Sequence, residues 1–359
     1  MSRPLWYRYF FFRFLFFVLF LSAICFSLFI IADLLAHIKD VVDPKTKWSA
    51  WGLYYLCMLS YRLDMLLPFS IACTTAIVLS RRVRNNELIP LLGAGLSVRE
   101  IARPFFAVAA LCSLVLLVNT QYIYPKAAHY HHVIEESDFG REKPSESSNQ
   151  LGIVLGKEGS RLFFAHHDKK LQELKDVFWV RSTDHVLHIE KLAYFPDQPP
   201  EGFHVDIVKR DSRGRMQKTE SYDHVELTEL SLSHKELKMA TADPRELSIF
   251  QLAYLVPRFG SSRSERAIES SICLYQKILF PLLAILAFLI PAPLCLRFEN
   301  RLPQALLLFF ALAVLFCYLI VVQAFVVLTR APICLPAPIL LLPWIIAFLI
   351  SKHRMASLS

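Results

Sequence analysis

The apolar run FFFRFLFFVLFLSAICFSLFIIA, which extends from Phe10 to Ala32, decides the fold class. An α-helix rises about 1.5 Å per residue, so about 20 apolar residues cross the ~30 Å core of a lipid bilayer. The run has that length and carries one charge, Arg13, whose long side chain can reach the nearby membrane surface. It is too long for the apolar part of a signal peptide, and no small-residue cleavage site follows it. We therefore expect a membrane-spanning helix.

The composition of the whole chain agrees with a membrane protein. Of the 359 residues, 55% are hydrophobic and 28 are Phe, and the mean hydropathy is +0.41. A soluble protein cannot bury that much apolar surface. The charged residues and His concentrate between residues 126 and 268, whereas all eight cysteines lie outside that stretch. The stretch therefore has no disulfide framework, and no CxxC or Cys/His cluster predicts a metal site.

Five further segments are long and apolar enough to cross a bilayer. The six predicted spans are residues 10–33, 53–79, 104–123, 271–296, 302–328 and 335–351. The last span is short, but it begins in the proline-rich stretch Ala331–Pro338, which suits a tight chain reversal. The spans therefore form two groups of three, separated by one long polar stretch.

Basic residues in the short loops predict the orientation, because cytoplasmic loops carry an excess of Lys and Arg. With six spans, the basic loops all fall on one side, which carries Arg3, Arg8, Arg81, Arg82, Arg84, Arg99, Arg103, Arg297, Arg301, Lys352 and Arg354. We expect this side, with both termini, to face the cytoplasm. The long polar stretch then lies outside, between the third and fourth spans. A count of five spans would break the pattern.

Basic residues also lie near the outer ends of the spans. Arg62 is about 28 Å from Arg81 along a helix that rises 1.5 Å per residue. Lys277 enters the fourth span from the same outer side, and Lys39 follows the end of the first span. Two interpretations are open. The side chains can snorkel to the headgroups, with a local pair between Arg62 and Asp64, or they form a cluster that contacts anionic groups in the outer leaflet.

The long polar stretch changes to short β-like runs from Gln150 onward. Turn residues separate runs at 151–155, 161–165, 177–181, 186–195, 203–208 and 222–227. Strands at this spacing favour an antiparallel sandwich or a jelly-roll-like pair of sheets. The predicted fold class is a membrane α-helical bundle of six transmembrane helices plus an all-β, jelly-roll-like domain.

The stretch Gly152–Glu158 resembles a phosphate-binding loop only loosely. Its spacing is one residue short, and Glu158 stands where a Ser or Thr would hold magnesium. The outer domain also lacks GxSxG and HExxH motifs, so we find no catalytic residues and expect no enzyme activity. If the protein moves a substrate, nucleotide hydrolysis belongs to another subunit.

The loop after the second span reads RRVRNNELIPLLGAGLSVREIARP, from Arg81 to Pro104. Glu87 is expected to open a short amphipathic helix, on which Leu88, Leu91 and Leu92 form an apolar stripe at helical spacing. Such a helix suits docking into a groove of a soluble partner. The alternative is a helix that merely lies on the lipid headgroups.

The residues that follow predict a turn and a second helix. Gly93 and Gly95 are expected to end or bend the short helix. Ser97 can then cap the helix that returns into the third span.

This order of basic loop, N-E-L, apolar helix, G-A-G-x-S and returning span resembles the LptF/LptG permease family of lipopolysaccharide exporters. Pro68 within the second span and the run Tyr122–Pro125 leaving the third span are also similar to that family. The resemblance extends over essentially the whole chain. It implies transmembrane helices 1–3 in residues 1–125 with a coupling helix at about 84–97, a periplasmic β-jelly-roll-like domain at 126–268, and transmembrane helices 4–6 at 269–359.

The resemblance implies that Glu87 is the acidic coupling residue of a permease that engages a separate ATPase. Leu88, Leu91, Leu92, Gly93, Gly95 and Ser97 would belong to the same ATPase-coupling segment. The implied partners are an LptB-like ATPase dimer, a paralogous permease, and LptC-like and LptA-like bridge proteins. The permease itself would hold no cofactor, because ATP and magnesium bind the ATPase, and no nucleic acid is expected.

The resemblance further implies that lipopolysaccharide is extracted from the outer leaflet of a Gram-negative inner membrane. Basic residues after the first span contact lipopolysaccharide in LptG-type members, and Lys39 falls in about that place, which favours the LptG-like over the LptF-like half. Arg62 and Lys277 are added as substrate contacts from their positions, not from the family. Rival functions are the permease of another lipid or lipoprotein exporter, and a membrane-anchored periplasmic scaffold without transport, which would not need the Glu87 helix.

Overall fold

The computed structural model describes residues 4–36, 48–137, 152–155, 160–168, 173–182, 184–194, 199–210, 215–228, 230, 242–256, 265–296, 303–330 and 341–356. The chain divides into two compact units. Met1–Gly140 and Pro244–Ser359 form a helical unit, and Arg141–Asp243 form a β unit. The predicted boundaries at 126 and 268 enclose the β unit together with helices that belong to the helical unit.

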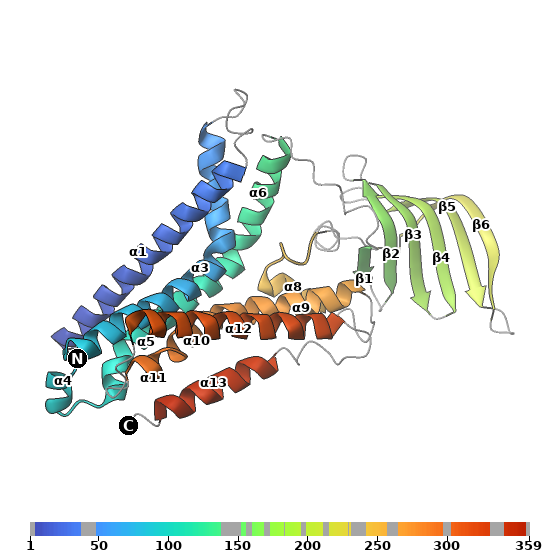
Figure 1. Cartoon of the computed structure of the whole chain (residues 1–359). Coiled ribbons are helices and arrows are strands. Elements are labelled where there is room, and N and C mark those ends of the chain that lie inside the picture. The colour runs from blue at the N-terminus through green and yellow to red at the C-terminus, as the bar shows by residue number, and fades with distance from the viewer. Residues whose placement is uncertain are drawn as a thin grey trace. The chain divides into compact units, whose positions relative to one another are not determined.

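The helical unit is a bundle of long apolar helices joined by shorter ones (Figure 1). Its α-helices are α1 (Leu5–Ala36), α3 (Trp48–Arg84), α4 (Ile89–Gly93), α5 (Val98–Val118), α6 (Tyr124–Ser137), α8 (Ile249–Leu255), α9 (Glu265–Leu279), α10 (Leu283–Leu289), α11 (Ala292–Cys295), α12 (Gln304–Arg330) and α13 (Leu341–Ala356). A π-helical turn (Asn119–Ile123) joins α5 to α6, and a 3₁₀ turn (Phe280–Leu282) joins α9 to α10.

Five helical stretches in the described residues are long and apolar enough to cross a membrane: Leu5–Ala36, Trp51–Arg84, Val98–Ala128, Ile268–Cys295 and Gln304–Leu328. They coincide with the first five predicted spans, which confirms a multi-span helical part. The sixth predicted span corresponds to α13, which has 16 described residues. The count of six therefore stays a prediction.

The fourth span is broken rather than continuous. Pro281 lies in the 3₁₀ turn between α9 and α10, and Pro291 precedes α11. A proline has no backbone N–H and its ring crowds the preceding turn, so it interrupts an α-helix. The second span keeps its helix through Pro68, because neighbouring helices surround that buried residue.

Aromatic packing joins the first and third spans, and a pair of hydrogen bonds joins the third to the second. Phe14 of α1 and Phe105 of α5 are fully buried, with their ring centroids 5.2 Å apart. Phe10 stacks on the same Phe105 ring at 5.7 Å. Ser60 of α3 donates a 2.7 Å hydrogen bond to Asn119, whose side-chain amide donates back to the Ser60 carbonyl at 3.0 Å. This reciprocal pair holds the π-helical turn against α3.

The β unit contains a six-stranded antiparallel sheet in the order of the sequence. Its strands are β1 (Gly152–Leu155), β2 (Arg161–Asp168), β3 (Glu173–Ser182), β4 (His185–Ala193), β5 (Glu201–Arg210) and β6 (Met216–Glu226). All six predicted strands are present, which confirms the all-β domain. The described strands form one meandering sheet, and the second sheet of a jelly roll is not among them.

One face of the sheet forms the apolar core of the β unit. Leu162, Val177, Ile189 and Val205 are almost completely buried on this face, while neighbouring side chains alternate to the other. A row of paired residues crosses the opposite face, and consists of Phe163, Phe178, His188, Asp206 and Ser221. The alternation explains why the strands were readable from the sequence.

Candidate functional site

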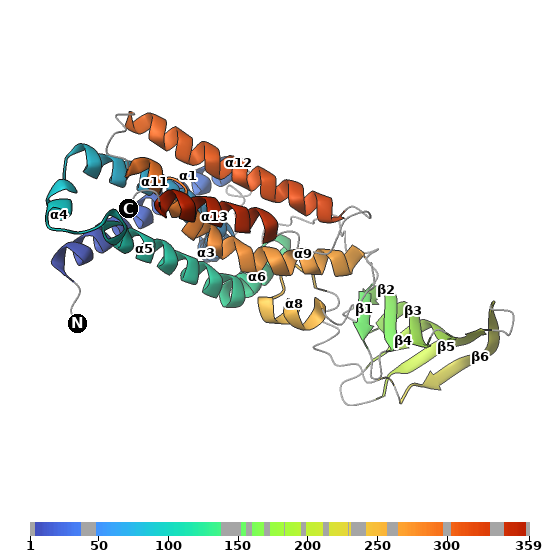
Figure 2. The same ribbon diagram turned by 90° about the horizontal axis from the view of Figure 1, so that it is seen from below.

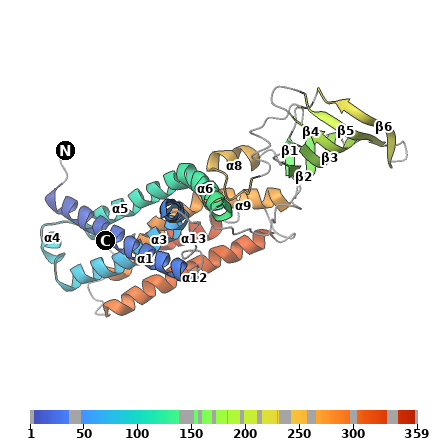
Figure 3. The same cartoon turned by 90° about the horizontal axis from the view of Figure 1, so that it is seen from above.

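The polar turn and short helix between α3 and α5 form the first candidate site. Figures 2 and 3 show α4 at the end of the bundle that also holds the N-terminal end of α1. The prediction that Glu87 opens the helix was wrong, because α4 begins at Ile89. Asn86 has a positive φ of 56° and Pro90 supplies the fixed backbone of the first helical turn. Glu87 therefore lies in the turn before α4.

The predicted glycine turn after α4 is confirmed. Gly95 has φ +85°, the left-handed conformation that glycine adopts without steric cost. Its N–H donates to the Leu92 carbonyl at 2.9 Å, and the Leu96 N–H donates to the Leu91 carbonyl at 3.1 Å. These two bonds form a Schellman motif, which satisfies the last carbonyls of the short helix.

Ser97 caps α5 as predicted. Its hydroxyl accepts a hydrogen bond from the Glu100 N–H at 3.3 Å, and the Glu100 carboxylate accepts one from the Ser97 N–H at 3.0 Å. This is a capping box, which satisfies two backbone donors at the start of the helix. The path from Gly95 into the third span is therefore fixed by local hydrogen bonds.

The apolar stripe faces inward. Leu88 is 2% exposed and belongs to the core of the helical unit, and Leu91 and Leu92 are half-buried against the same core. The side of this segment that meets solvent instead carries Ile89, which is 52% exposed, and Pro90. A partner would therefore meet Glu87, Ile89 and Pro90, while the leucines anchor the segment to its own bundle.

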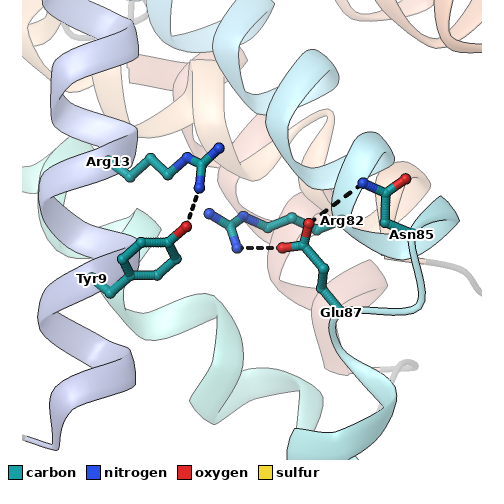
Figure 4. Close-up of polar contacts among 5 residues, drawn as sticks. All are labelled: Tyr9, Arg13, Arg82, Asn85 and Glu87. Carbon is teal, nitrogen blue, oxygen red and sulfur yellow. Dashed lines mark hydrogen bonds and ion pairs between the residues drawn. The ribbon is translucent and has the colours of Figure 1, made fainter.

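An ion pair fixes the carboxylate of Glu87. The Arg82 guanidinium lies 2.8 Å from Glu87 Oε2. The Arg82 side chain is 5% exposed, whereas the Glu87 side chain is 43% exposed. Figure 4 shows the two side chains meeting between α3 and α4, with Tyr9 and Arg13 of α1 beside them. In the sequence, Arg82 is distinguished only as one of several loop charges.

Two basic residues contact aromatic rings in a second candidate site. One of them, Arg62, lies about 30 Å from Arg82 along α3, at 1.5 Å per residue, and the other, Lys277, lies on α9. The guanidinium of Arg62 lies 5.5 Å from the centroid of the Tyr61 ring, which stacks on the Tyr124 ring at 5.3 Å. The Lys277 ammonium lies 4.9 Å from the centroid of the Tyr124 ring. Arg62 and Lys277 are thus brought to the two ends of one pair of stacked tyrosines. The two tyrosines were missed because their register depends on how α3 packs on α6.

Arg62 also contacts α1. Its guanidinium lies 4.7 Å from the centroid of the Phe29 ring, and its buried Nε has no hydrogen-bond partner among the described residues. No ion pair within 4.0 Å joins Arg62 to Asp64 in the described part of the chain, where the guanidinium contacts aromatic rings. Lys39, the third predicted substrate contact, lies outside the described residues.

Lys277 binds backbone as well as a ring. Its ammonium donates to the carbonyl of Arg245 at 2.6 Å and to that of Leu247. These carbonyls immediately precede α8, so Lys277 fastens that segment to α9.

The comparison with known protein families agrees with this architecture. The sequence model of the lipopolysaccharide export system permease LptF/LptG matches residues 8–356. The chain belongs to the LptF/LptG family. This membership confirms the resemblance drawn from the loop motif, and makes the chain a multi-pass membrane permease of lipopolysaccharide export, which is not by itself an enzyme. No individual curated protein matches the chain.

The stretch that loosely resembles a phosphate-binding loop begins in the sheet. The first residues of this stretch, Gly152–Leu155, form strand β1, which pairs with β2 along its whole length. A phosphate-binding loop instead wraps its backbone N–H groups around the ligand and leads into a helix. The described part of this stretch therefore belongs to the sheet.

Proposed function

We propose that this LptF/LptG chain is the permease subunit of an ABC transporter, which extracts lipopolysaccharide from the outer leaflet of the inner membrane of a Gram-negative bacterium. It would work as a heterodimer with a paralogous permease on an LptB-like ATPase dimer. The observation that carries this proposal is the exposed Glu87 beside α4, an acidic group presented at the basic end of the bundle. That end would face the cytoplasm with both termini.

The ATPase would supply the energy, and would bind ATP and magnesium. Glu87 offers a carboxylate to a basic residue in a groove of the ATPase, and Ile89 and Pro90 offer a small apolar contact beside it. A charge-assisted hydrogen bond of this kind contributes about 1.5–3 kcal/mol. ATP-driven closure of the ATPase dimer would displace this segment and narrow the cavity between the two permeases.

The stacked tyrosines and their two cations support a site for the phosphates of the lipid. Arg62 and Lys277 both lie far from the basic end of the bundle, where the outer leaflet would be. The guanidinium of Arg62 rests on aromatic rings with its Nε unpaired, so it retains donors for an anionic group. Lys39 would contribute from the end of the first span. Apolar side chains would hold the acyl chains.

The β unit would receive the lipid and pass it to a periplasmic bridge of LptC-like and LptA-like proteins. In the described sheet, β1 and β6 form the two edges. An exposed edge presents unpaired backbone donors and acceptors, which a strand of another protein can pair with. Pairing at such an edge would give the lipid a route from the membrane to the bridge.

The coupling role is tested with Glu87→Lys in the assembled complex. The reversed charge should abolish co-purification of the ATPase, because it places two basic groups together. Glu226→Lys, a charge reversal on β6, is the matched control and should leave ATPase binding unchanged. Normal ATPase binding and lipopolysaccharide transport by Glu87→Lys would refute the coupling role.

The substrate contacts are tested separately with Arg62→Glu and Lys277→Glu. Reversed charge should lower photocrosslinking of lipopolysaccharide to the bundle, with ATPase co-purification retained. Unchanged crosslinking in the double variant would remove both residues from the lipid site. Since Lys277 also fastens the segment before α8, Lys277→Arg serves as the control that keeps the charge.

A further inference from the structure

A buried cation lies at the base of the coupling segment. The Arg82 side chain is 5% exposed and projects from the last turn of α3. Burying a guanidinium carries a large desolvation cost, and replacing a buried ion pair by apolar residues is often neutral or even stabilising. The stability of the bundle therefore does not explain why an arginine stands at this position.

The contacts of Arg82 join three parts of the chain. Its guanidinium lies 4.1 Å from the centroid of the Phe10 ring and 5.6 Å from that of Tyr9, both on α1. The Tyr9 hydroxyl in turn accepts a hydrogen bond from Arg13. The Arg82 carbonyl accepts the backbone N–H of Glu87 at 3.0 Å, in addition to the ion pair between the side chains. Arg82 thus contacts α1 with its planar face and Glu87 with its edge.

The two oxygens of the Glu87 carboxylate are not equivalent. Oε2 receives the Arg82 guanidinium at 2.8 Å. Oε1 faces the Asn85 amide at 3.5 Å, which is the long limit for a hydrogen bond. Because the side chain is 43% exposed, Oε1 remains available to a second cation from outside. A carboxylate accepts hydrogen bonds at about four lone-pair sites, so one oxygen can face inward while the other faces a partner.

We propose that Arg82 is a positioning residue, which holds Glu87 with Oε2 inward and Oε1 outward so that the carboxylate bridges the α1–α3 end of the bundle to a basic group of the ATPase. This inference rests on the coupling role proposed for Glu87. It adds that a second residue, which does not touch the ATPase, determines how tightly Glu87 binds it and ties α1 to the contact.

A double-mutant cycle tests the inference. The full complex is reconstituted in nanodiscs, and the dissociation constant of the ATPase is measured for Arg82→Met, Glu87→Gln and the double variant. Methionine keeps much of the apolar stem of arginine and removes the charge. Arg81→Met is the matched control, because it removes the same charge from the adjacent, exposed position on the same helix.

Arg82→Met should weaken ATPase binding about tenfold in the chain that has Glu87, which corresponds to about 1.4 kcal/mol. In the Glu87→Gln background, Arg82→Met should change the dissociation constant less than twofold, because the group it positions is gone. Arg81→Met should have no comparable effect. Arg82→Lys, which keeps the charge but not the planar fork, should restore part of the affinity.

Three outcomes separate the possibilities. An unchanged affinity in Arg82→Met, with Glu87→Gln impaired, would overturn the positioning role and leave the coupling role intact. An equal loss in both backgrounds would also overturn it, since Arg82 would then act independently of Glu87. An unimpaired Glu87→Gln would instead refute the coupling role itself. The thermal unfolding of each purified variant identifies failure to fold, in which case Arg82→Lys carries the comparison.

Discussion

Two glycines of the coupling segment should respond in opposite ways to the same substitution. Gly95 has φ +85°, and a Cβ added there would meet nothing within 4 Å. The cost of Gly95→Ala is therefore purely that of the left-handed backbone, about 1–2 kcal/mol. Gly93 is the last residue of α4 and also has nothing within 4 Å of an added Cβ. Gly93→Ala should thus be neutral, or stabilising by up to about 1 kcal/mol.

Hydrogen exchange of the amides of Gly95 and Leu96 measures this difference. Both amides donate to carbonyls of α4 in the Schellman motif, so they exchange when the turn opens. A cost of about 1.4 kcal/mol corresponds to a tenfold increase in the open population. We expect exchange about 5- to 30-fold faster in Gly95→Ala, at Leu96 and its neighbours, and no acceleration in Gly93→Ala.

The comparison isolates the backbone conformation, because an added Cβ would meet nothing within 4 Å at either position. Equal exchange in the two variants would refute the assignment of a left-handed Gly95 and with it the Schellman motif. The ATPase dissociation constant should rise with the exchange rate, because docking of Glu87 needs a well-ordered turn.

Three further predictions concern the anchors of the two units. Leu88→Ala should lower the free energy of unfolding by about 2–5 kcal/mol, because it leaves a cavity at a buried site. Ile89→Ala, at an exposed position, should leave stability nearly unchanged and weaken ATPase binding. Equal effects of the two variants on thermal unfolding would contradict the inward orientation of Leu88. Asn119→Ala should cost about 1–3 kcal/mol, since it leaves a buried serine unpaired, and a wild-type unfolding temperature in detergent would contradict this. Hydrogen bonds from Lys218 and Ser221 hold the pKa of Asp206 below its usual 3.8. The stability that the Asp206 carboxylate contributes is therefore complete above pH 3.8, and is lost as the pH falls through the lowered pKa. In Asp206→Asn, the exchange rates of the β5 amides should lose this part of their pH dependence.

Local patterns predicted the helices and strands, because each pattern directly reports what an element buries. The run from Phe10 to Ala32 is apolar on all sides, and α1 follows it. The predicted run 177–181 lies within β3, where Val177 and Trp179 are buried. Ser97 and Gly95 carry their hydrogen-bonding and conformational preferences in their own chemistry, so the cap and the turn were also predictable.

Tertiary contacts were not predictable in the same way. The sequence shows Leu88, Leu91 and Leu92 as an apolar stripe, but not whether the stripe faces a partner or its own bundle. Arg82 is one of five arginines between residues 81 and 103, and no local feature marks it as buried. Arg82 is buried because the N-terminal end of α1 packs on it, through Tyr9 and Phe10, which are far from Arg82 in the sequence.

The coupling segment can transmit a displacement only if it is fastened to the bundle. A helix as short as α4, with five residues, has no stability of its own, because nucleation costs more than its few hydrogen bonds return. Its order must come from the buried Leu88 on one side and from the capped α5 on the other. Arg82 adds a link from Glu87 to the start of α1. A force applied at Glu87 would therefore act on α1, α3 and α5 together. If the fastenings were loosened, the motion of whatever ATPase remained bound would displace only the turn, and hydrolysis would proceed without lipid movement.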